Sequence, residues 1–251
     1  MYPLIFSYGI ISIGGYGIML GLAFYLGFLI GEREFKLNNK DPELAYKLFL
    51  VAIPSGIVGA KVFHILEHMD EFTRDPLATI FSGAGLSVYG GLLLALAVSI
   101  LVIRRSRESV LEVFDLSTPT LSLGYAIGRI GCHVAGDGCY GIPTALFLGN
   151  AYPNGIVPTS AEVLPASLFE SFISFLILIA ILQLRKRELP AGMLFFIYLI
   201  LNGVPRFFIE FIRLNPTFLG FTQAQYVAIL IVITGIVGII MVRRKASSTP
   251  A

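Results

Sequence analysis

Residues 222–242 read TQAQYVAILIVITGIVGIIMV, an apolar stretch without a charged side chain. A helix of about 20 residues is long enough to cross a hydrocarbon core of about 30 Å. Three basic residues, Arg243, Arg244 and Lys245, follow the stretch directly. We therefore predict a membrane-spanning helix here, with its basic end at the cytoplasmic surface.

Similar apolar stretches recur along the 251-residue chain. Hydrophobic residues make up 56% of the sequence and charged residues 14%, whereas a soluble domain has about 25% charged residues. The pattern predicts an all-α integral membrane protein in one domain over 1–251, surrounded by lipid bilayer and not bound to nucleic acid. We expect about seven transmembrane helices, near 7–30, 45–66, 87–103, 113–135, 165–184, 191–211 and 222–242.

The basic residues predict the orientation of these helices. Most of the 18 Lys and Arg residues fall in alternate connections, around 33–47, 104–107 and 185–187 and in the tail at 243–245. The long connection at 136–163 contains neither Lys nor Arg. Because cytoplasmic loops are enriched in basic residues, we predict an N-terminus outside and a C-terminus in the cytoplasm.

Three other basic residues, Lys61, Arg129 and Arg206, fall inside apolar sequence. A charge inside the membrane costs about 3 kcal/mol or more unless it faces a polar cavity or a partner. The predicted topology places all three in outward-facing halves of helices, which indicates a pocket for an anion such as a phospholipid headgroup.

Structural ion pairs are an alternative explanation for two of these cations. Glu210 follows Arg206 by one helical turn and could pair with it. Asp137 or Glu170 could neutralise Arg129 in the same way.

Residues 128–141, which read GRIGCHVAGDGCYG, are the densest cluster of unusual residues. The segment begins in the fourth predicted helix and continues into an irregular glycine-rich loop. Its glycines would let backbone N–H groups approach a ligand closely. Irregular backbone at this depth is tolerated only where it lines a cavity or packs in protein.

The same segment resembles the signature of the prolipoprotein diacylglyceryl transferases, roughly Gly-Arg-x-Gly-Asn-Phe-x-Asn-Gly-Glu-x-x-Gly. Four further segments resemble that family in the same order, and the resemblance spans nearly the whole chain. They are Tyr16-Gly17, SVYGGL at 87–92, PASLFE at 165–170, and RFFIEFIR at 206–213 with Thr222, Gln223 and Gln225 after it.

The resemblance implies a multi-pass enzyme of the bacterial inner membrane whose site faces the extracytoplasmic side. Such an enzyme moves a diacylglyceryl group from phosphatidylglycerol to the thiol of a lipoprotein signal-sequence cysteine and releases glycerol phosphate. The chemistry requires neither a cofactor nor a metal. The implied catalytic residues are Tyr89, Arg129, Arg206 and Asp137, and the spacing of His133 to Arg129 adds His133 as a candidate substitute base. The implied substrate-binding residues are Tyr16, Gly90, Gly91, Gly131, Gly136, Gly141, Glu170, Glu210 and Arg213.

Within this set, Arg129 and Arg206 would hold the phosphate, and Glu170 and Glu210 would orient the arginines. His133 follows Arg129 by one helical turn and could act as a base, or it could simply be hydrogen-bonded at the membrane interface.

The sequence also departs from the family pattern. The family's histidine before Gly-Gly-Leu is Tyr89 here, whose phenol has a pKa near 10 and is a poor base. Its two signature asparagines are Cys132 and Ala135, its glutamate is Asp137, and its second histidine is Leu164. Two hypotheses therefore stay open. One is a divergent transferase acting on phosphatidylglycerol or another anionic phospholipid and on a lipoprotein cysteine or another acceptor. The other is a non-catalytic or repurposed phospholipid-binding protein.

Cys132 and Cys139 are the two cysteines of the chain, and both are predicted on the oxidising side. They could form a disulfide or remain two thiols. Together with His133 and Asp137 they could form a zinc site, although six residues between the cysteines is atypical spacing.

Overall fold

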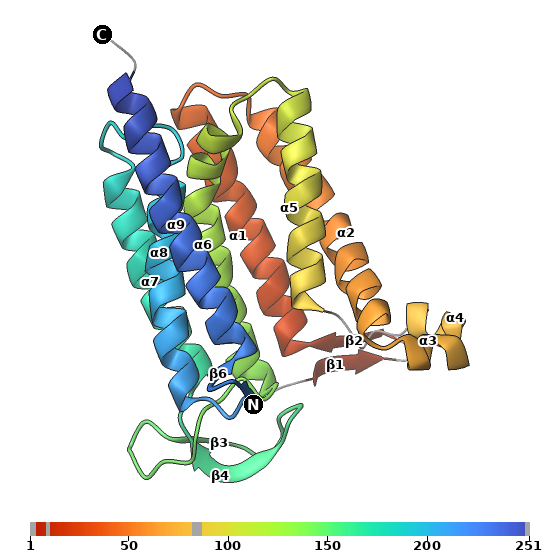
Figure 1. Ribbon diagram of the computed structural model, residues 1–251. Helices are drawn as coiled ribbons and strands as arrows, with labels where there is room; N and C mark the ends of the chain where they lie inside the picture. The colour runs from red at the N-terminus through yellow and green to blue at the C-terminus, as the bar shows by residue number, and fades with distance from the viewer. Residues whose placement is uncertain (1–3, 9–10, 82–86, 249–251) are drawn as a thin grey trace. The chain divides into compact units, whose positions relative to one another are not determined.

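The computed structural model describes residues 4–8, 11–81 and 87–248, which form long helices and short hairpins (Figure 1). The long helices are α1 (Gly15–Leu37), α2 (Pro42–Glu67), α5 (Val88–Arg105), α6 (Val110–Ala135), α7 (Ala166–Leu184), α8 (Met193–Ile209) and α9 (Gln223–Ser248). The short helices are α3 (Met69–Arg74), α4 (Pro76–Phe81) and the 3-10 turn η1 (Glu210–Ile212). Antiparallel pairs join β1 (Leu4–Tyr8) to β2 (Ile11–Gly14), β3 (Asn150–Tyr152) to β4 (Thr159–Val163), and β5 (Thr217–Phe218) to β6 (Phe221–Thr222).

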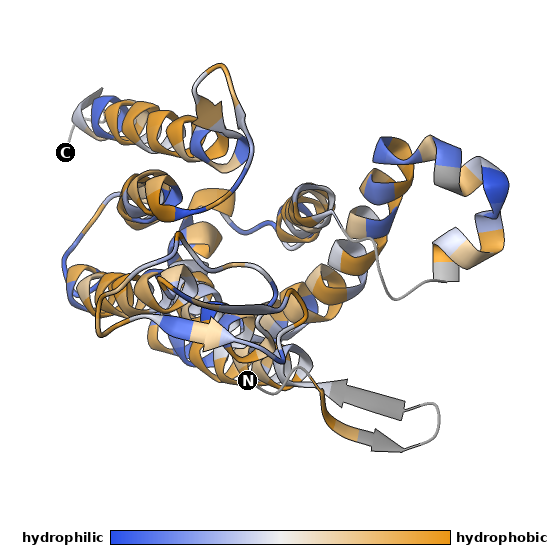
Figure 2. Ribbon diagram, turned by 90° about the horizontal axis from the view of Figure 1, so that it is seen from below, coloured by the Kyte–Doolittle hydropathy of each residue, from blue (hydrophilic) through white to orange (hydrophobic). Residues whose placement is uncertain are grey.

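The prediction of an all-α integral membrane protein is confirmed. Within the described residues, six helices are long and apolar enough to cross a membrane, and they include α9. Figure 2 shows hydrophobic residues along α9 and hydrophilic residues toward its C-terminal end. The helix predicted near 113–135 is α6, which carries Glu112, Asp115 and Arg129. The count of seven spans and the orientation stay predictions.

The first helix differs from the predicted one. We expected it over 7–30, but it begins at Gly15 and is preceded by the β1–β2 hairpin, with residues 9–10 outside the described part of the chain. In β2, Ile11 and Ile13 are β-branched and alternate with smaller residues, which favours a strand. An apolar run alone does not separate this pattern from the start of a helix.

The chain folds into two compact units, each described by itself. One comprises Met1–Gly31 and Phe114–Ala251, and the other comprises Glu32–Val113. The single domain over 1–251 therefore stays a prediction.

In the unit Glu32–Val113, glycines bring α2 and α5 into backbone contact. A Cβ atom added at Gly90 would lie 2.5 Å from the carbonyl oxygen of Gly59, and one added at Gly91 would lie 2.8 Å from that of Gly56. Small residues at helix interfaces allow this close approach in membranes. The structure thus gives Gly90 and Gly91 a packing role, and their part in substrate binding stays a prediction.

In the other unit, hydroxyl groups fix α6 against α7. Ser122 Oγ donates to the carbonyl oxygen of Ser174 at 3.0 Å, and Ser174 Oγ donates to that of Ser122 at 3.1 Å. Ser171 Oγ donates to the carbonyl oxygen of Ala126 at 2.8 Å. Such bonds contribute about 0.6 kcal/mol each between membrane helices. They hold in register the two helices that carry the central site residues.

A carboxylate on α6 caps the start of α8. Asp115 Oδ2 accepts from the backbone N–H of Gly192 at 2.6 Å, and Oδ1 accepts from that of Phe195 at 2.7 Å. Gly192 has φ of 88°, a left-handed conformation that favours glycine. An anion at a helix N-terminus satisfies N–H groups that lack a partner within the helix.

We expect Asp115→Ala to lower the free energy of unfolding by about 1–3 kcal/mol, because two N–H groups at the start of α8 lose their acceptor. Asp115→Asn keeps one side-chain oxygen and should cost less. Denaturant unfolding in detergent micelles measures both. An alanine variant as stable as the wild type would contradict this role.

Candidate functional site

Five charged side chains, from three helices and from the chain at and just after η1, form a largely buried cluster, which we call the arginine–glutamate cluster. Its glutamates are almost completely buried, with side-chain exposures of 2% for Glu170 and 0% for Glu210. Buried charges are strongly destabilising unless they are paired. The members are Arg129 on α6, Glu170 on α7, Arg206 on α8, Glu210 in η1, and Arg213 just after η1.

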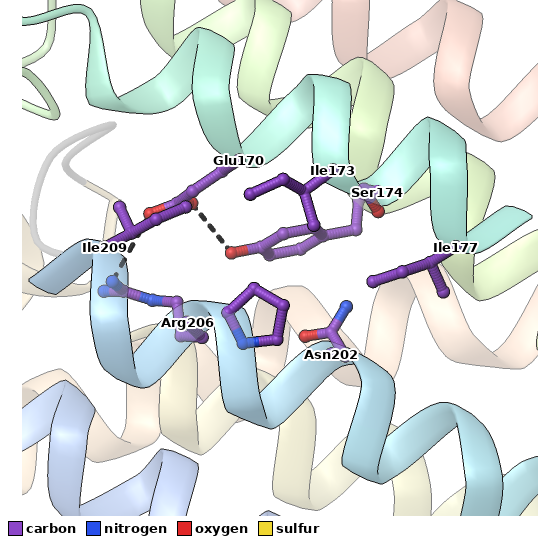
Figure 3. A pocket seen from close by; sticks show the side chains of 9 residues that line it. Glu170, Ile173, Ser174, Ile177, Asn202, Arg206 and Ile209 are labelled. Atoms are coloured by element: carbon purple, nitrogen blue, oxygen red, sulfur yellow. Dashed lines mark hydrogen bonds and ion pairs between the residues drawn. The ribbon is translucent and has the colours of Figure 1, made fainter.

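Glu170 is the centre of this cluster. One of its oxygens, Oε2, pairs with Arg129 Nε and accepts a hydrogen bond from the Tyr125 hydroxyl at 2.8 Å. The other, Oε1, lies 3.3 Å from Arg206 Nη1 and 3.6 Å from Arg213 Nη1. Figure 3 shows Glu170 pointing from α7 toward Arg206 on α8, across a small pocket. One carboxylate therefore orients three guanidinium groups.

Glu210 is the second carboxylate of the cluster. Its Oε2 pairs with Arg206 Nη1 and lies 3.8 Å from Arg213 Nε, while its Oε1 accepts from Asn215 Nδ2. The ion pairs considered as an alternative are thus present, both Arg206 with Glu210 and Arg129 with Glu170. Among the five side chains, however, three guanidinium groups face two carboxylates. The cluster keeps one positive charge that an anion could neutralise.

Arg129 directs part of its guanidinium group away from the carboxylates. Its Nη1 lies 3.6 Å from Cys139 Sγ and 3.8 Å from Cys132 Sγ, and its Nη2 donates to the Tyr125 hydroxyl at 3.2 Å. The guanidinium carbon also lies 5.1 Å from the centre of the Tyr125 ring. Thiols are weak hydrogen-bond acceptors, so a phosphate oxygen would be a stronger partner for Nη1.

The glycine-rich loop predicted after the fourth helix is present. Gly136 and Gly138 have φ of 61° and 85°, which explains glycine at both positions. The backbone of Gly136 touches Gly155, and Val157 N donates to the carbonyl oxygen of Gly136 at 2.9 Å. These contacts fasten the end of α6 to the β3–β4 hairpin.

The loop is also fastened to the segment that carries Arg213. Gly141 N donates to the carbonyl oxygen of Leu164 at 2.7 Å, and Ile142 N donates to that of Ile212 at 2.8 Å. A Cβ atom at Gly141 would collide with the Ile212 carbonyl oxygen. Gly136 and Gly141 therefore position the loop, and their contact with substrate stays a prediction.

His133 and Asp137 hold the loop through hydrogen bonds. His133 Nδ1 lies 3.0 Å from the Tyr152 hydroxyl, with the two rings edge to face. Asp137 Oδ1 accepts from the backbone N–H of Cys139 at 3.1 Å. The hydrogen-bonded alternative for His133 thus describes its contact in this structure, and catalytic roles for both residues stay predictions.

The remaining predicted residues divide between the two units. Tyr16 packs beside Gly131, because a Cβ atom there would lie 3.2 Å from Tyr16 Cδ2. Tyr89 lies on α5 and Lys61 on α2, both in the unit Glu32–Val113. Within the unit Met1–Gly31 and Phe114–Ala251, the structure brings Arg206 and Arg213 to the same glutamate as Arg129.

The chain matches known proteins along its length. The sequence model of the prolipoprotein diacylglyceryl transferases matches residues 3–241. The chain belongs to this family. A phosphatidylglycerol–prolipoprotein diacylglyceryl transferase of Clostridium botulinum (strain Hall) is 29% identical over 98% of both chains. Transferases of the same name from Finegoldia magna and Clostridium tetani are 31% and 27% identical, over 90% and 94% of this chain and 90% and 96% of their own. The family resemblance seen in the five segments is confirmed.

Two residues that contact the arginine–glutamate cluster, Tyr125 and Asn215, were not predicted from the sequence. Tyr125 precedes Arg129 by four residues, so the helical spacing could have indicated its contact with that arginine. Asn215, which donates to Glu210, lies beyond η1 in irregular chain where no periodic pattern applies.

Cys132 and Cys139 are thiols without a disulfide between them, and both lie beside Arg129 of the cluster. A sulfur atom of each and a carboxylate oxygen of Asp137 lie within 4.8 Å of one another, close enough in geometry to share a metal ion. The guanidinium groups of Arg129 and Arg213 both face the sulfur of Cys139, and that of Arg129 also faces the sulfur of Cys132. Two fixed positive charges disfavour a cation here and favour an anion.

Proposed function

We propose that this family member transfers a diacylglyceryl group from phosphatidylglycerol to the thiol of a lipoprotein signal-sequence cysteine. The observation that carries the proposal is the charge of the arginine–glutamate cluster. Its three guanidinium groups exceed its two carboxylates by one, and the phosphodiester of phosphatidylglycerol carries one negative charge.

The cluster has the geometry to bind that phosphodiester and to stabilise the glycerol phosphate that leaves. A guanidinium group is planar and can donate two parallel hydrogen bonds to a phosphate. When the bond between the glyceryl carbon and the phosphate oxygen breaks, negative charge builds on the phosphate. Arg129, Arg206 and Arg213 are already held in place by Glu170 and Glu210, so they stabilise this charge without first having to reorganise.

The acceptor supplies the nucleophile in this reaction. Its sulfur forms a bond to the glyceryl carbon as the carbon–oxygen bond breaks, and glycerol phosphate leaves. The protein itself then needs no covalent intermediate. Holding lipid and peptide together would supply much of the rate by proximity.

We place this multi-pass protein in the bacterial inner membrane, with the cluster toward the extracytoplasmic side. The distribution of Lys and Arg supports this orientation, because the loop that begins beside the cluster, at 136–163, contains neither residue. A lipid donor and a secreted acceptor would meet on that side.

A second function, phospholipid binding without catalysis, is favoured by one observation. Tyr89 stands where the family has a histidine, and a phenol is a poor general base near neutral pH. In that case the cluster would bind phosphatidylglycerol without turning it over.

A transfer assay separates the two functions. The purified protein is mixed with phosphatidylglycerol labelled in its acyl chains and with a lipobox peptide, and the label on the peptide is measured. We expect label on the cysteine peptide, none on a matched serine peptide, and none when zwitterionic phosphatidylcholine replaces the donor. Binding of phosphatidylglycerol without transfer would contradict the proposal and support the second function.

Tyr89 gives a further prediction for this assay. We expect Tyr89→Phe to lower kcat/KM by about tenfold or less, as for one lost hydrogen bond of about 1 kcal/mol. A thousandfold loss would show instead that the phenol takes part in proton transfer. Binding of phosphatidylglycerol, measured in parallel, should be unchanged in this variant.

A further inference from the structure

Two turns outside the helices carry the most exposed apolar side chains of the unit that contains the arginine–glutamate cluster. Among the described residues of this unit, the large hydrophobic side chains with the highest exposure are Phe147, Leu219 and Phe218, at 93%, 83% and 72%. Leu230, on the outer face of the apolar helix α9, is less exposed, at 64%. We propose that both turns insert into the surface of the lipid bilayer and hold this end of the protein there.

The first turn is the tip of the β5–β6 hairpin, which connects two helices that are long and apolar enough to span the membrane. These spans, Met193–Ile212 and Gln223–Ser247, leave only residues 213–222 between them. Because both ends of this short connection begin at a span, its tip stays close to the bilayer surface. The hydroxyl group of Tyr226 on α9 donates to the carbonyl oxygen of Phe218 at 2.7 Å and holds the tip beside the start of that span.

The second turn, at 146–148, follows a segment that is bonded to the ends of two spans. Ile142 N donates to the carbonyl oxygen of Ile212, where one span ends, and Leu164 N, just before α7, donates to that of Ile142 at 3.0 Å. Phe147 follows Ile142 by five residues, which is at most about 18 Å of extended chain. The headgroup region is itself about 5–8 Å deep on each side of the bilayer, so the second turn also lies within reach of lipid. Figure 1 shows β3, β4 and β6 at the same end of α8 and α9.

Hydrogen bonds shape the second turn so that its apolar side chains lie on the outside. Leu146 N donates to Thr144 Oγ1 at 3.2 Å, and Gly149 N donates to the carbonyl oxygen of Leu146 at 2.9 Å. A Cβ atom at Gly149 would lie 3.1 Å from Thr144 Cγ2, so the two ends of the turn are closely packed. Leu146, Phe147 and Leu148 are all exposed on this turn.

The chemistry of the two turns favours lipid as the partner. The connection that carries Phe147 has no charged residue between Asp137 and Glu162, and exposed apolar patches mark sites of interaction. Phe211 and Leu214, both exposed, join the β5–β6 tip to the outer surface of α8, which spans the bilayer. A peptide or small ligand is usually held in a groove, whereas these side chains project outward. Lipid closes around a projecting side chain, and elements that lie in a membrane surface bury Phe and Leu about 5–10 Å deep.

Tryptophan fluorescence tests the insertion of each turn. The sequence contains no tryptophan, so Phe147→Trp and Phe218→Trp each give the protein one indole. The full-length variants are placed in vesicles of phosphatidylglycerol and phosphatidylcholine. Quenching by phosphatidylcholine brominated on its acyl chains is then compared with quenching by acrylamide from the water. Lys186→Trp, in a charged connection, is the control for exposure to water, and Phe172→Trp, exposed on α7, is the control for exposure to lipid.

We expect brominated lipid to lower the emission of both turn variants by about twofold, as in the lipid control, because their indoles lie among the upper acyl carbons. Acrylamide should quench both variants several times less than it quenches the water control. Emission that responds to acrylamide as the water control does, and not to brominated lipid, would overturn the insertion of that turn.

A lipobox peptide, added in the same experiment, distinguishes lipid from the acceptor as the partner. Shielding of the indole from acrylamide by the peptide, without quenching by brominated lipid, would overturn the proposal in favour of an acceptor site. Insertion does not depend on catalysis by the cluster, and quenching is measured without any product. A protein that inserts both turns but transfers no lipid would therefore contradict the proposed function alone.

Discussion

Replacing Arg129 with alanine is expected to lower kcat/KM for diacylglyceryl transfer by about 10³-fold. The guanidinium group pairs with Glu170 through Nε and leaves Nη1 directed toward the thiols, where a phosphate oxygen would be a stronger partner. Removing a preorganised donor to a developing oxyanion costs about 10²–10³-fold, and Arg129 contributes a full charge in addition. Initial rates with labelled phosphatidylglycerol measure the loss.

Two further variants control this experiment. Arg129→Lys keeps the charge but loses the planar pair of donors, so it should recover only a small part of the activity. Arg244→Ala removes an exposed arginine at the end of α9 and should turn over like the wild type. Retention of more than a tenth of the activity in Arg129→Ala would contradict a direct role in holding phosphate.

Removing Glu170 is expected to have the largest effect on stability. Glu170→Ala leaves three partly buried guanidinium groups with Glu210 as the only carboxylate of the cluster. Breaking a buried ion pair by removing one partner costs about 3–5 kcal/mol. Denaturant unfolding in detergent micelles should show a loss of this size.

A double variant tests the charge argument behind this prediction. Glu170→Ala combined with Arg206→Ala removes one charge of each sign, so the two losses of stability should be less than additive. A single variant within about 1 kcal/mol of the wild type would contradict a central position for Glu170, since such a loss is typical of ordinary substitutions.

Much of the helical framework could be predicted because membrane helices are long, apolar and bounded by charge. Residues 222–242, for example, fall almost entirely within α9. The β1–β2 hairpin was missed because a short apolar run has no length or periodicity that separates it from the first turns of a helix. The β3–β4 hairpin lies in a segment where the sequence indicated only an irregular loop.

The residues of the candidate site could be predicted from the sequence, but their arrangement in space could not. Helical spacing indicated the pair of Arg206 and Glu210, and the family resemblance indicated Glu170. The sharing of Glu170 among three arginines depends on how α6, α7 and α8 pack, which no local pattern specifies. In the same way, membrane depth marked Arg129 and Arg206 as unusual, whereas Arg213 was indicated only by the family resemblance.

The most direct test of the account is to measure both products of a single reaction. Purified protein in phosphatidylglycerol vesicles is given a lipobox peptide, and mass spectrometry follows the peptide and the released glycerol phosphate, beside Arg129→Ala. We expect the peptide to gain one diacylglyceryl group for each glycerol phosphate released, and both products to be nearly absent with Arg129→Ala. Phosphatidylglycerol that is bound in an Arg129-dependent way, with neither product formed, would contradict the account.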